Sequence, residues 1–121
     1  MDPMLEALNA GLPDLGLSLP AGAAETMCAF GQALLEKNQV MNLTAITEPR
    51  QVAQLHFLDS LTLLTLADFR HKQVIDVGCG GGFPGVPLKI ACPDMGLTLL
   101  DSLGKRMTLS LIHISEPTRP Y

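Results

Sequence analysis

Aromatic residues, cysteine motifs and long apolar runs are all scarce in this chain of 121 residues. It has four Phe, one Tyr and no Trp, so aliphatic side chains and Met must build its core. Three cysteines without a Cys-x-x-Cys motif or a His cluster argue against a disulfide framework or a zinc site. No apolar stretch approaches the length of about 18 residues that spans a membrane. The first residues lack the basic segment followed by an apolar run that is typical of a secretory signal, so none is expected here. We therefore expect no metal, no membrane association and a reducing cytoplasmic location.

Positive charge is also in short supply. Eight Lys and Arg stand against twelve Asp and Glu, which gives a net charge of −4. Domains that bind nucleic acid usually carry a basic surface, so composition alone argues mildly against such a partner. Apolar residues make up 47% of the chain and charged residues 17%, which is enough to bury a core. Length and composition together predict one ordinary folded domain.

Helical periodicity dominates the first 72 residues. A short helix is predicted over residues 3–12, ending near Gly11 and Pro13. A second is predicted from residue 21 to about residue 40, because apolar residues recur there at spacings of three, four and seven. The stretch NLTAIT at 42–47 predicts a loop or a short extended piece. Glu48 and Pro49 then predict the start of a third helix that runs to about Leu66. Its apolar stripe is expected to contain Val52, Leu55, Leu58 and Leu61.

Polar residues cluster on a neighbouring face of this third helix. His56, Asp59 and Ser60 are separated by three and four residues, so a helix brings them together. Two interpretations are open. The three side chains could line a face that binds a cofactor or RNA, or they could make local hydrogen bonds, for example with residues 42–47.

The pattern changes at residue 73. QVIDVG predicts a buried parallel strand, and a glycine-rich turn follows at 78–82. VPLKIACP predicts a helix that ends at Pro93, and GLTLLD at 96–101 predicts a second strand. Strand, turn, helix and strand in this order form a βαβ unit, so the sequence predicts the α/β class.

The turn within DVGCGGGFPG, residues 76–85, suits a ligand with a negatively charged group, because glycine allows close backbone approach before a helix. GGGFPG matches the dinucleotide fingerprint, which would indicate a nicotinamide-dependent oxidoreductase, although Pro84 lacks the N–H that should face a pyrophosphate. The pattern D-x-G-x-G-x-G of class I S-adenosyl-L-methionine-dependent methyltransferases also matches, at Asp76, Gly78, Gly80 and Gly82. Asp101 ends the next strand, where an acid can bind a ribose diol. A turn without a ligand is the third interpretation.

The last residues fit this scheme poorly. A helix should follow the second strand to cover the sheet, and SLGKRMT is a plausible start for it. LSLIHISEPTRPY instead alternates like a strand. We therefore expect three parts: a helical extension over 1–72, the start of a cofactor-binding domain over 73–108, and a non-native tail over 109–121.

Four stretches together resemble a known family. They are NLTAIT, HFLDSL at 56–61, VIDVGCGGGFPGVPLKI at 74–90 and TLLDSLGKR at 98–106. The chain resembles, from about Asn38 to Arg106, the bacterial ribosomal RNA small-subunit methyltransferase G family, also called glucose-inhibited division protein B. The resemblance implies N-terminal helices followed by the first βαβ unit of a Rossmann-like class I methyltransferase fold, here incomplete. It also implies methylation of guanine N7 in 16S rRNA, with S-adenosyl-L-methionine as the methyl donor.

The resemblance also suggests site residues. Gly78 and Phe83 fall at cofactor-contact positions, and Gly80 and Gly82 belong to the same loop. Asp76 would organise the loop, and Asp101 would bind the ribose. No catalytic residue is expected, because N7 of guanine has a free lone pair and no proton to remove. Since the later strands of the family have no counterpart here, we expect an inactive fragment. An oxidoreductase fragment and a non-catalytic helical interaction module remain as alternatives.

Overall fold

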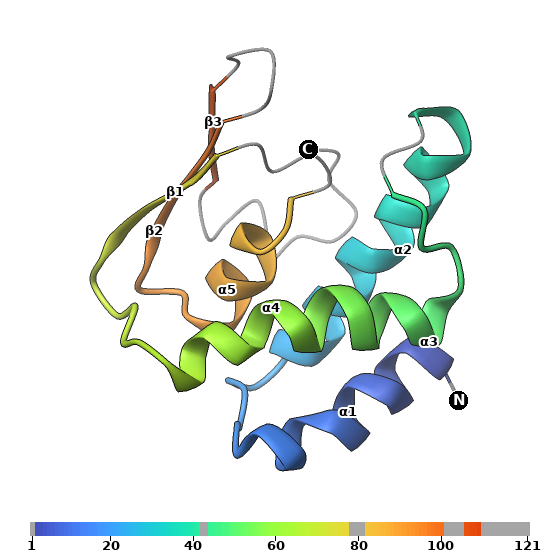
Figure 1. Ribbon diagram of the computed structural model, residues 1–121, viewed down its shortest axis with the longest axis horizontal. Coiled ribbons are helices and arrows are strands. Elements are labelled where there is room, and N and C mark those ends of the chain that lie inside the picture. Colours follow the sequence, from blue (N-terminus) through green and yellow to red (C-terminus); the bar gives the residue numbers. More distant parts are fainter. Residues whose placement is uncertain (1, 42–43, 78–81, 101–105, 110–121) are drawn as a thin grey trace.

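The computed structural model describes residues 2–41, 44–77, 82–100 and 106–109. Helices occupy the first part of the chain and an α/β unit follows, which confirms the predicted class (Figure 1). The elements are α1 (Pro3–Leu15), α2 (Ala23–Met41), α3 (Pro49–Gln51), the π-helical segment η1 (Val52–Leu58), α4 (Asp59–Leu61), the 3-10 segment η2 (Thr62–Thr65), β1 (Gln73–Val77), α5 (Gly85–Ala91), β2 (Gly96–Leu100) and β3 (Arg106–Leu109).

Helix α1 begins where the sequence predicts and ends three residues later. The Asp2 carboxylate accepts a hydrogen bond from the Met4 N–H at 2.9 Å and caps the first turn. The helix continues through Pro13 and ends before Gly16, which has a left-handed φ of 69°. Burial of Leu12 and packing of Leu15 against the core outweigh the hydrogen bond that a proline forfeits in the last turn.

A nearly continuous helical run extends from α3 to η2. Its predicted start is confirmed, since the Glu48 carboxylate accepts hydrogen bonds from the N–H groups of residues 50 and 51. The predicted apolar stripe is partly wrong. Val52 and Leu61 are fully buried, but Leu55 is 53% exposed while Phe57 is fully buried. The π-helical turns of η1 have more residues per turn than an α-helix, so the buried face follows a longer spacing.

One hydrophobic core joins the helices to the sheet. Helix α5 lies between them, in contact with α2 and α4 on one side and with β1 and β2 on the other (Figure 1). The largest fully buried side chains come from both parts of the chain: Phe57, Met4, Leu8, Met27, Leu61, Leu88, Met95 and Leu97. Truncation of such a side chain to Ala typically costs about 2–5 kcal/mol. The helices therefore fix the position of α5, the helix that follows the glycine-rich turn.

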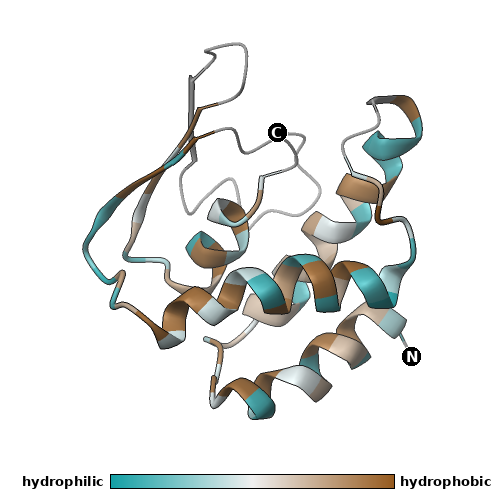
Figure 2. Cartoon of the chain, viewed as in Figure 1, coloured by the Kyte–Doolittle hydropathy of each residue, from teal (hydrophilic) through white to brown (hydrophobic). Residues whose placement is uncertain are grey.

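The sheet confirms the predicted parallel pair. Strands β1 and β2 run parallel, with Gln73 opposite Gly96 and Val77 opposite Leu100. Leu97 and Leu99 of β2 are buried. The expectation that β1 is fully buried is wrong, because Ile75 and Val77 are 65% and 71% exposed. Figure 2 shows hydrophobic residues on both strands. Within the described residues, one face of β1 is left without a covering helix.

A buried lysine closes the connection from α5 to β2. The Lys89 side chain is almost fully buried, and its ammonium donates hydrogen bonds to the carbonyls of Pro93 at 2.7 Å and Met95 at 2.5 Å. These charge-assisted bonds satisfy carbonyl groups near the helix end.

The third strand differs from the sequence prediction. Arg106–Leu109 forms β3, antiparallel to β2, where a covering helix was expected to begin. The free edge of β2 offers unpaired backbone groups, and a segment with alternating character can pair with them. Residues 110–121, which make up most of the predicted non-native tail, lie outside the described residues.

Candidate functional site at the glycine-rich turn

Asp76 connects the end of β1 to the first residue of α5. Its Oδ2 atom accepts a hydrogen bond from the Gly85 N–H at 2.9 Å. A Cβ at Gly85 would lie 2.8 Å from that oxygen and 3.0 Å from Leu97, so only glycine allows this approach. Partial burial raises the pKa of Asp76, and the hydrogen bond from Gly85 acts in the opposite direction. The turn is therefore closed by a half-buried carboxylate at the helix start.

Gly82 is the described glycine of the predicted loop. Its φ of 98° lies in the region that favours glycine. A Cβ there would also meet Val86 at 3.0 Å and Phe30 at 3.2 Å. The Val86 N–H donates to the Gly82 carbonyl at 2.8 Å and begins the helical hydrogen bonds. Gly78, Gly80 and Asp101, the other predicted members of the site, lie outside the described residues.

Phe83 packs the turn against the helices. Its ring lies parallel to the imidazole of His56, with centroids 4.1 Å apart and an angle of 4° between the planes. Phe30 meets it edge-on at 5.8 Å, and Phe57 lies tilted at 5.9 Å. Phe83, which follows Gly82, thus contacts two of the chain's three other phenylalanines. The sequence pointed to Phe83 only through the family resemblance; the aromatic cluster itself had no local signal.

His56 ties this cluster to the segment between α2 and α3. Its Nε2 shares a hydrogen bond of 2.9 Å with the Thr44 hydroxyl, which also accepts from the Ile46 N–H at 3.0 Å. The Thr44 N–H donates in turn to Asn38 Oδ1 at 2.7 Å. Burial lowers the pKa of His56, while the charge of Asp59 acts against that shift. The interpretation of local hydrogen bonds with residues 42–47 is thereby confirmed for His56.

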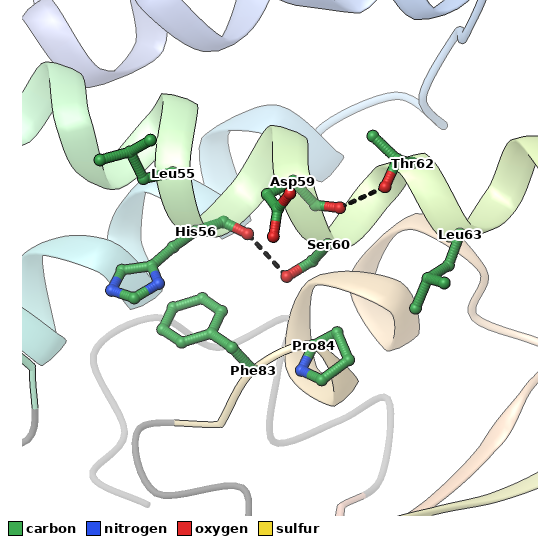
Figure 3. A pocket seen from close by; sticks show the side chains of 8 residues that line it. All are labelled: Leu55, His56, Asp59, Ser60, Thr62, Leu63, Phe83 and Pro84. Atoms are coloured by element: carbon green, nitrogen blue, oxygen red, sulfur yellow. Dashed lines mark hydrogen bonds between the residues drawn. The ribbon is translucent and has the colours of Figure 1, made fainter.

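A pocket of about 350 Å³ lies between the helical run and the turn. Figure 3 shows the helix side chains on one side, opposite the rings of Phe83 and Pro84. The lining residues are Leu55, His56, Asp59, Ser60, Thr62, Leu63, Phe83 and Pro84. The structure therefore brings the predicted cluster of His56, Asp59 and Ser60 to the glycine-rich turn. Sequence reasoning missed Thr62 and Leu63, since a helix periodicity alone does not show which residues meet a distant turn.

Residues outside the pocket bear on other functions that a sequence can suggest, such as a reactive thiol, a metal site or a membrane span. Burial raises the pKa of the Cys28 thiol to about 12, which leaves it unreactive. Arg70 is exposed and pairs with Asp68 at 2.8 Å, just before β1. Within the described residues, no group of His, Cys, Asp and Glu could hold a metal ion. No helix in that part of the chain is long and apolar enough to cross a membrane.

Comparison with known proteins identifies relatives along most of the chain. The family model GidB, described as rRNA small subunit methyltransferase G, matches residues 23–113. The chain is 44% identical over 105 residues to a ribosomal RNA small subunit methyltransferase G from Alkalilimnicola ehrlichii, which covers 87% of this chain and 47% of that protein. It is 46% identical over 104 residues to the protein of the same name from Caldanaerobacter subterraneus, covering 85% and 44%.

A third relative extends slightly further. The Coxiella burnetii protein of the same name is 43% identical over 108 residues, which is 89% of this chain and 52% of the relative. The chain therefore spans about half the length of the curated relatives that it matches. A match over most of the chain and identities above 40% show the family: this chain belongs to the GidB family of rRNA small subunit methyltransferase G proteins.

Proposed function

We propose that this chain carries the S-adenosyl-L-methionine-binding turn of a methyltransferase that acts on guanine N7 of small-subunit rRNA. The observation that carries the proposal is the hydrogen bond from Gly85 to Asp76, which closes the turn next to Gly82 and Phe83. The family name supports a methyl donor and an rRNA substrate. An enzyme of this kind works in the cytoplasm, where ribosomal subunits are found.

The described residues fit this cofactor in their chemistry. Asp76 places a carboxylate beside the helix start, where it can attract the positive charge of a sulfonium or an amino group. The half-buried ring of Phe83, next to Gly82, offers an apolar contact. We propose that Gly78, Gly80 and Asp101 complete the site, with Asp101 accepting from the ribose hydroxyls. When bound, the cofactor supplies an electrophilic methyl group.

The division of the chain follows from the same proposal. Residues 1–72 would form a helical extension, and residues 73–108 would begin the cofactor-binding domain. The helices contribute His56, which stacks on Phe83, so the extension helps to fix the turn. Because N7 carries a free lone pair, the chain's residues need only bind and orient the two reactants, an effect that can contribute several kcal/mol.

A nicotinamide-dependent oxidoreductase fits the geometry less well. In the dinucleotide fold the pyrophosphate sits at the helix N-terminus and accepts hydrogen bonds from its N–H groups. Here the Gly85 N–H is already donated to Asp76, and Pro84 has no N–H to offer. A carboxylate at this place would repel a pyrophosphate. The local electrostatics therefore favour a positively charged group beside Asp76, and not the negatively charged group that a glycine-rich turn before a helix suits by itself.

Titration calorimetry on the chain tests the cofactor assignment. S-adenosyl-L-methionine and S-adenosylhomocysteine should release heat, whereas NAD should not. Asp76→Asn should weaken the binding of S-adenosyl-L-methionine at least tenfold, because the negative charge is lost while the acceptor for the Gly85 N–H remains. Asp14→Asn removes an exposed carboxylate on α1 and should leave the affinity unchanged. The proposal would be overturned if neither S-adenosyl-L-methionine nor S-adenosylhomocysteine released heat, or if NAD bound more tightly than both.

A further inference from the structure

Asp59 contributes a carboxylate to the pocket, in the part of the chain that the structure describes. The Ser60 hydroxyl donates to the His56 carbonyl at 2.6 Å, and the Thr62 hydroxyl donates to the Asp59 backbone carbonyl at 2.5 Å. The His56 ring is held by Thr44. Among the described residues, no hydrogen bond or ion pair engages the Asp59 side chain, which is exposed and lines the pocket (Figure 3).

Four apolar side chains line the pocket beside this carboxylate. Leu55 is 53% exposed although it lies in the middle of the helical run, and Leu63, Phe83 and Pro84 surround the rest of the space. The π-helical turns of η1 turn Leu55 out of the core, and such turns are frequent at functional sites. Apolar side chains beside one carboxylate suit an aromatic ring that carries hydrogen-bond donors on one edge.

The chemistry of the nucleobases narrows this choice. A carboxylate has two acceptor oxygens and no donor. Guanine presents two neighbouring donors on its Watson–Crick edge, N1–H and the N2 amino group, which a carboxylate can accept together. Adenine and cytosine place an acceptor next to their amino group, and uracil has a single donor between two carbonyls. Of the four bases of RNA, guanine is therefore the best match to Asp59.

We propose that this pocket receives the guanine base turned out of the RNA strand, with Asp59 accepting hydrogen bonds from N1–H and N2–H. The inference rests on the proposed function and names the residue that selects its substrate. Enzymes that modify a base commonly take it out of the stack into such a pocket. Guanine methylated at N7 carries a positive charge, because the lone pair has become a bond to carbon. The Asp59 carboxylate therefore stabilises the methylated base more than the unmethylated one.

The test uses nucleoside monophosphates and the 121-residue chain. Methyl signals of Leu55 and Leu63 are followed by NMR while GMP, 7-methyl-GMP or AMP is added. We expect 7-methyl-GMP to bind several-fold tighter than GMP, and GMP tighter than AMP, with shifts at both leucines. Asp59→Asn should abolish the preference of 7-methyl-GMP over GMP, and Asp14→Asn, another exposed helical carboxylate, should preserve it.

Two outcomes overturn the inference. One is an absence of shifts at Leu55 and Leu63 with every nucleotide, and the other is an equal response to GMP and AMP that Asp59→Asn leaves unchanged. The helical content of both variants is compared by circular dichroism; Asp59 makes no side-chain hydrogen bond within the described residues, so both should fold. Calorimetry with S-adenosylhomocysteine on the same samples separates this result from the cofactor proposal: it should bind Asp59→Asn as it binds the unchanged chain.

Discussion

The imidazole of His56 lies flat against the ring of Phe83, with centroids 4.1 Å apart and an angle of 4° between the planes. This contact joins a π-helical segment to the glycine-rich turn, which is 27 positions later in the chain. His56 is itself held by Thr44. Asn38, in turn, accepts a hydrogen bond from the Thr44 N–H. The position of the turn therefore depends on three segments that are separate in the sequence.

We expect His56 and Phe83 to be energetically coupled. A double-mutant cycle with His56→Ala and Phe83→Ala should give a coupling energy of about 0.5–1.5 kcal/mol, the range for stacked aromatic pairs. Urea unfolding followed by circular dichroism provides the four stabilities. A matched cycle with the exposed His71 in place of His56 should show no coupling, because distant sites add independently. Equal coupling in the two cycles would contradict a specific contact.

His56 should make stability depend on pH. Burial lowers its folded-state pKa below the ordinary value of 6.5, so the unfolded chain takes up a proton before the folded chain does. The contribution of neutral His56 to the free energy of unfolding is therefore complete above pH 6.5. It is lost as the pH falls toward the folded-state pKa. Unfolding measured at several pH values between neutral and mildly acidic should show this loss.

The matched variants separate His56 from the other described histidine. His56→Gln should flatten the pH dependence of the unfolding free energy in this range. His71→Asn should retain it, since His71 is exposed and its left-handed φ of 61° suits Asn. A dependence that survives His56→Gln would show that another group causes it.

Gly82 and Gly22 offer a second matched pair. Both have positive φ, 98° and 80°, so alanine at either position should cost about 1 kcal/mol through backbone strain. Only at Gly82 would the new Cβ also meet neighbours, Val86 at 3.0 Å and Phe30 at 3.2 Å, while Gly22 faces open space. Overpacking typically adds about 1–3 kcal/mol. For Gly82→Ala, the midpoint of thermal unfolding should therefore be well below that of Gly22→Ala. Equal decreases in the two midpoints would argue against close packing at the turn.

The sequence was most informative where a local signal acts alone. The cap by Glu48 and the helix after the turn follow from residues within a few positions of each other. The parallel pairing of β1 with β2 follows from the order strand, turn, helix and strand. The family resemblance also suggested that Asp76 organises the loop, and Asp76 accepts a hydrogen bond from the Gly85 N–H. Of the pattern's members, Asp76 and Gly82 lie within the described residues, and the role of every predicted site residue in cofactor binding stays a prediction.

Tertiary contacts decided what the sequence could not show. The π-helical turns exchanged Leu55 for Phe57 in the core, because packing of the whole helical run overrides a simple period. The pocket combines residues 55–63 with Phe83 and Pro84, which no sequence spacing connects. Strand β3 was unexpected because the pairing of an edge depends on which segment reaches it.

Asp76 should affect stability and cofactor binding through different atoms. Asp76→Ala leaves the Gly85 N–H without its acceptor, which should cost about 1–3 kcal/mol. Asp76→Asn keeps an acceptor oxygen, so the loss should be much smaller. Because partial burial raises the pKa of Asp76 above its ordinary value of 3.8, the folded chain holds this proton more tightly, and ionisation destabilises the fold as the pH rises through the raised pKa. Asp76→Asn should remove that destabilisation above the raised pKa.

The effects on stability and on cofactor binding are separated by two measurements on the unchanged chain, Asp76→Ala and Asp76→Asn. These are urea unfolding at acidic and neutral pH, and calorimetry. Asp76→Asn should remain folded at neutral pH and still bind S-adenosyl-L-methionine at least tenfold more weakly, because the loss comes from the charge and not from the shape of the turn. If Asp76→Asn instead lost as much stability as Asp76→Ala, the carboxylate charge itself would hold the start of α5. Weaker binding could then follow from an opened turn, and a direct contact between Asp76 and the cofactor would lose its support.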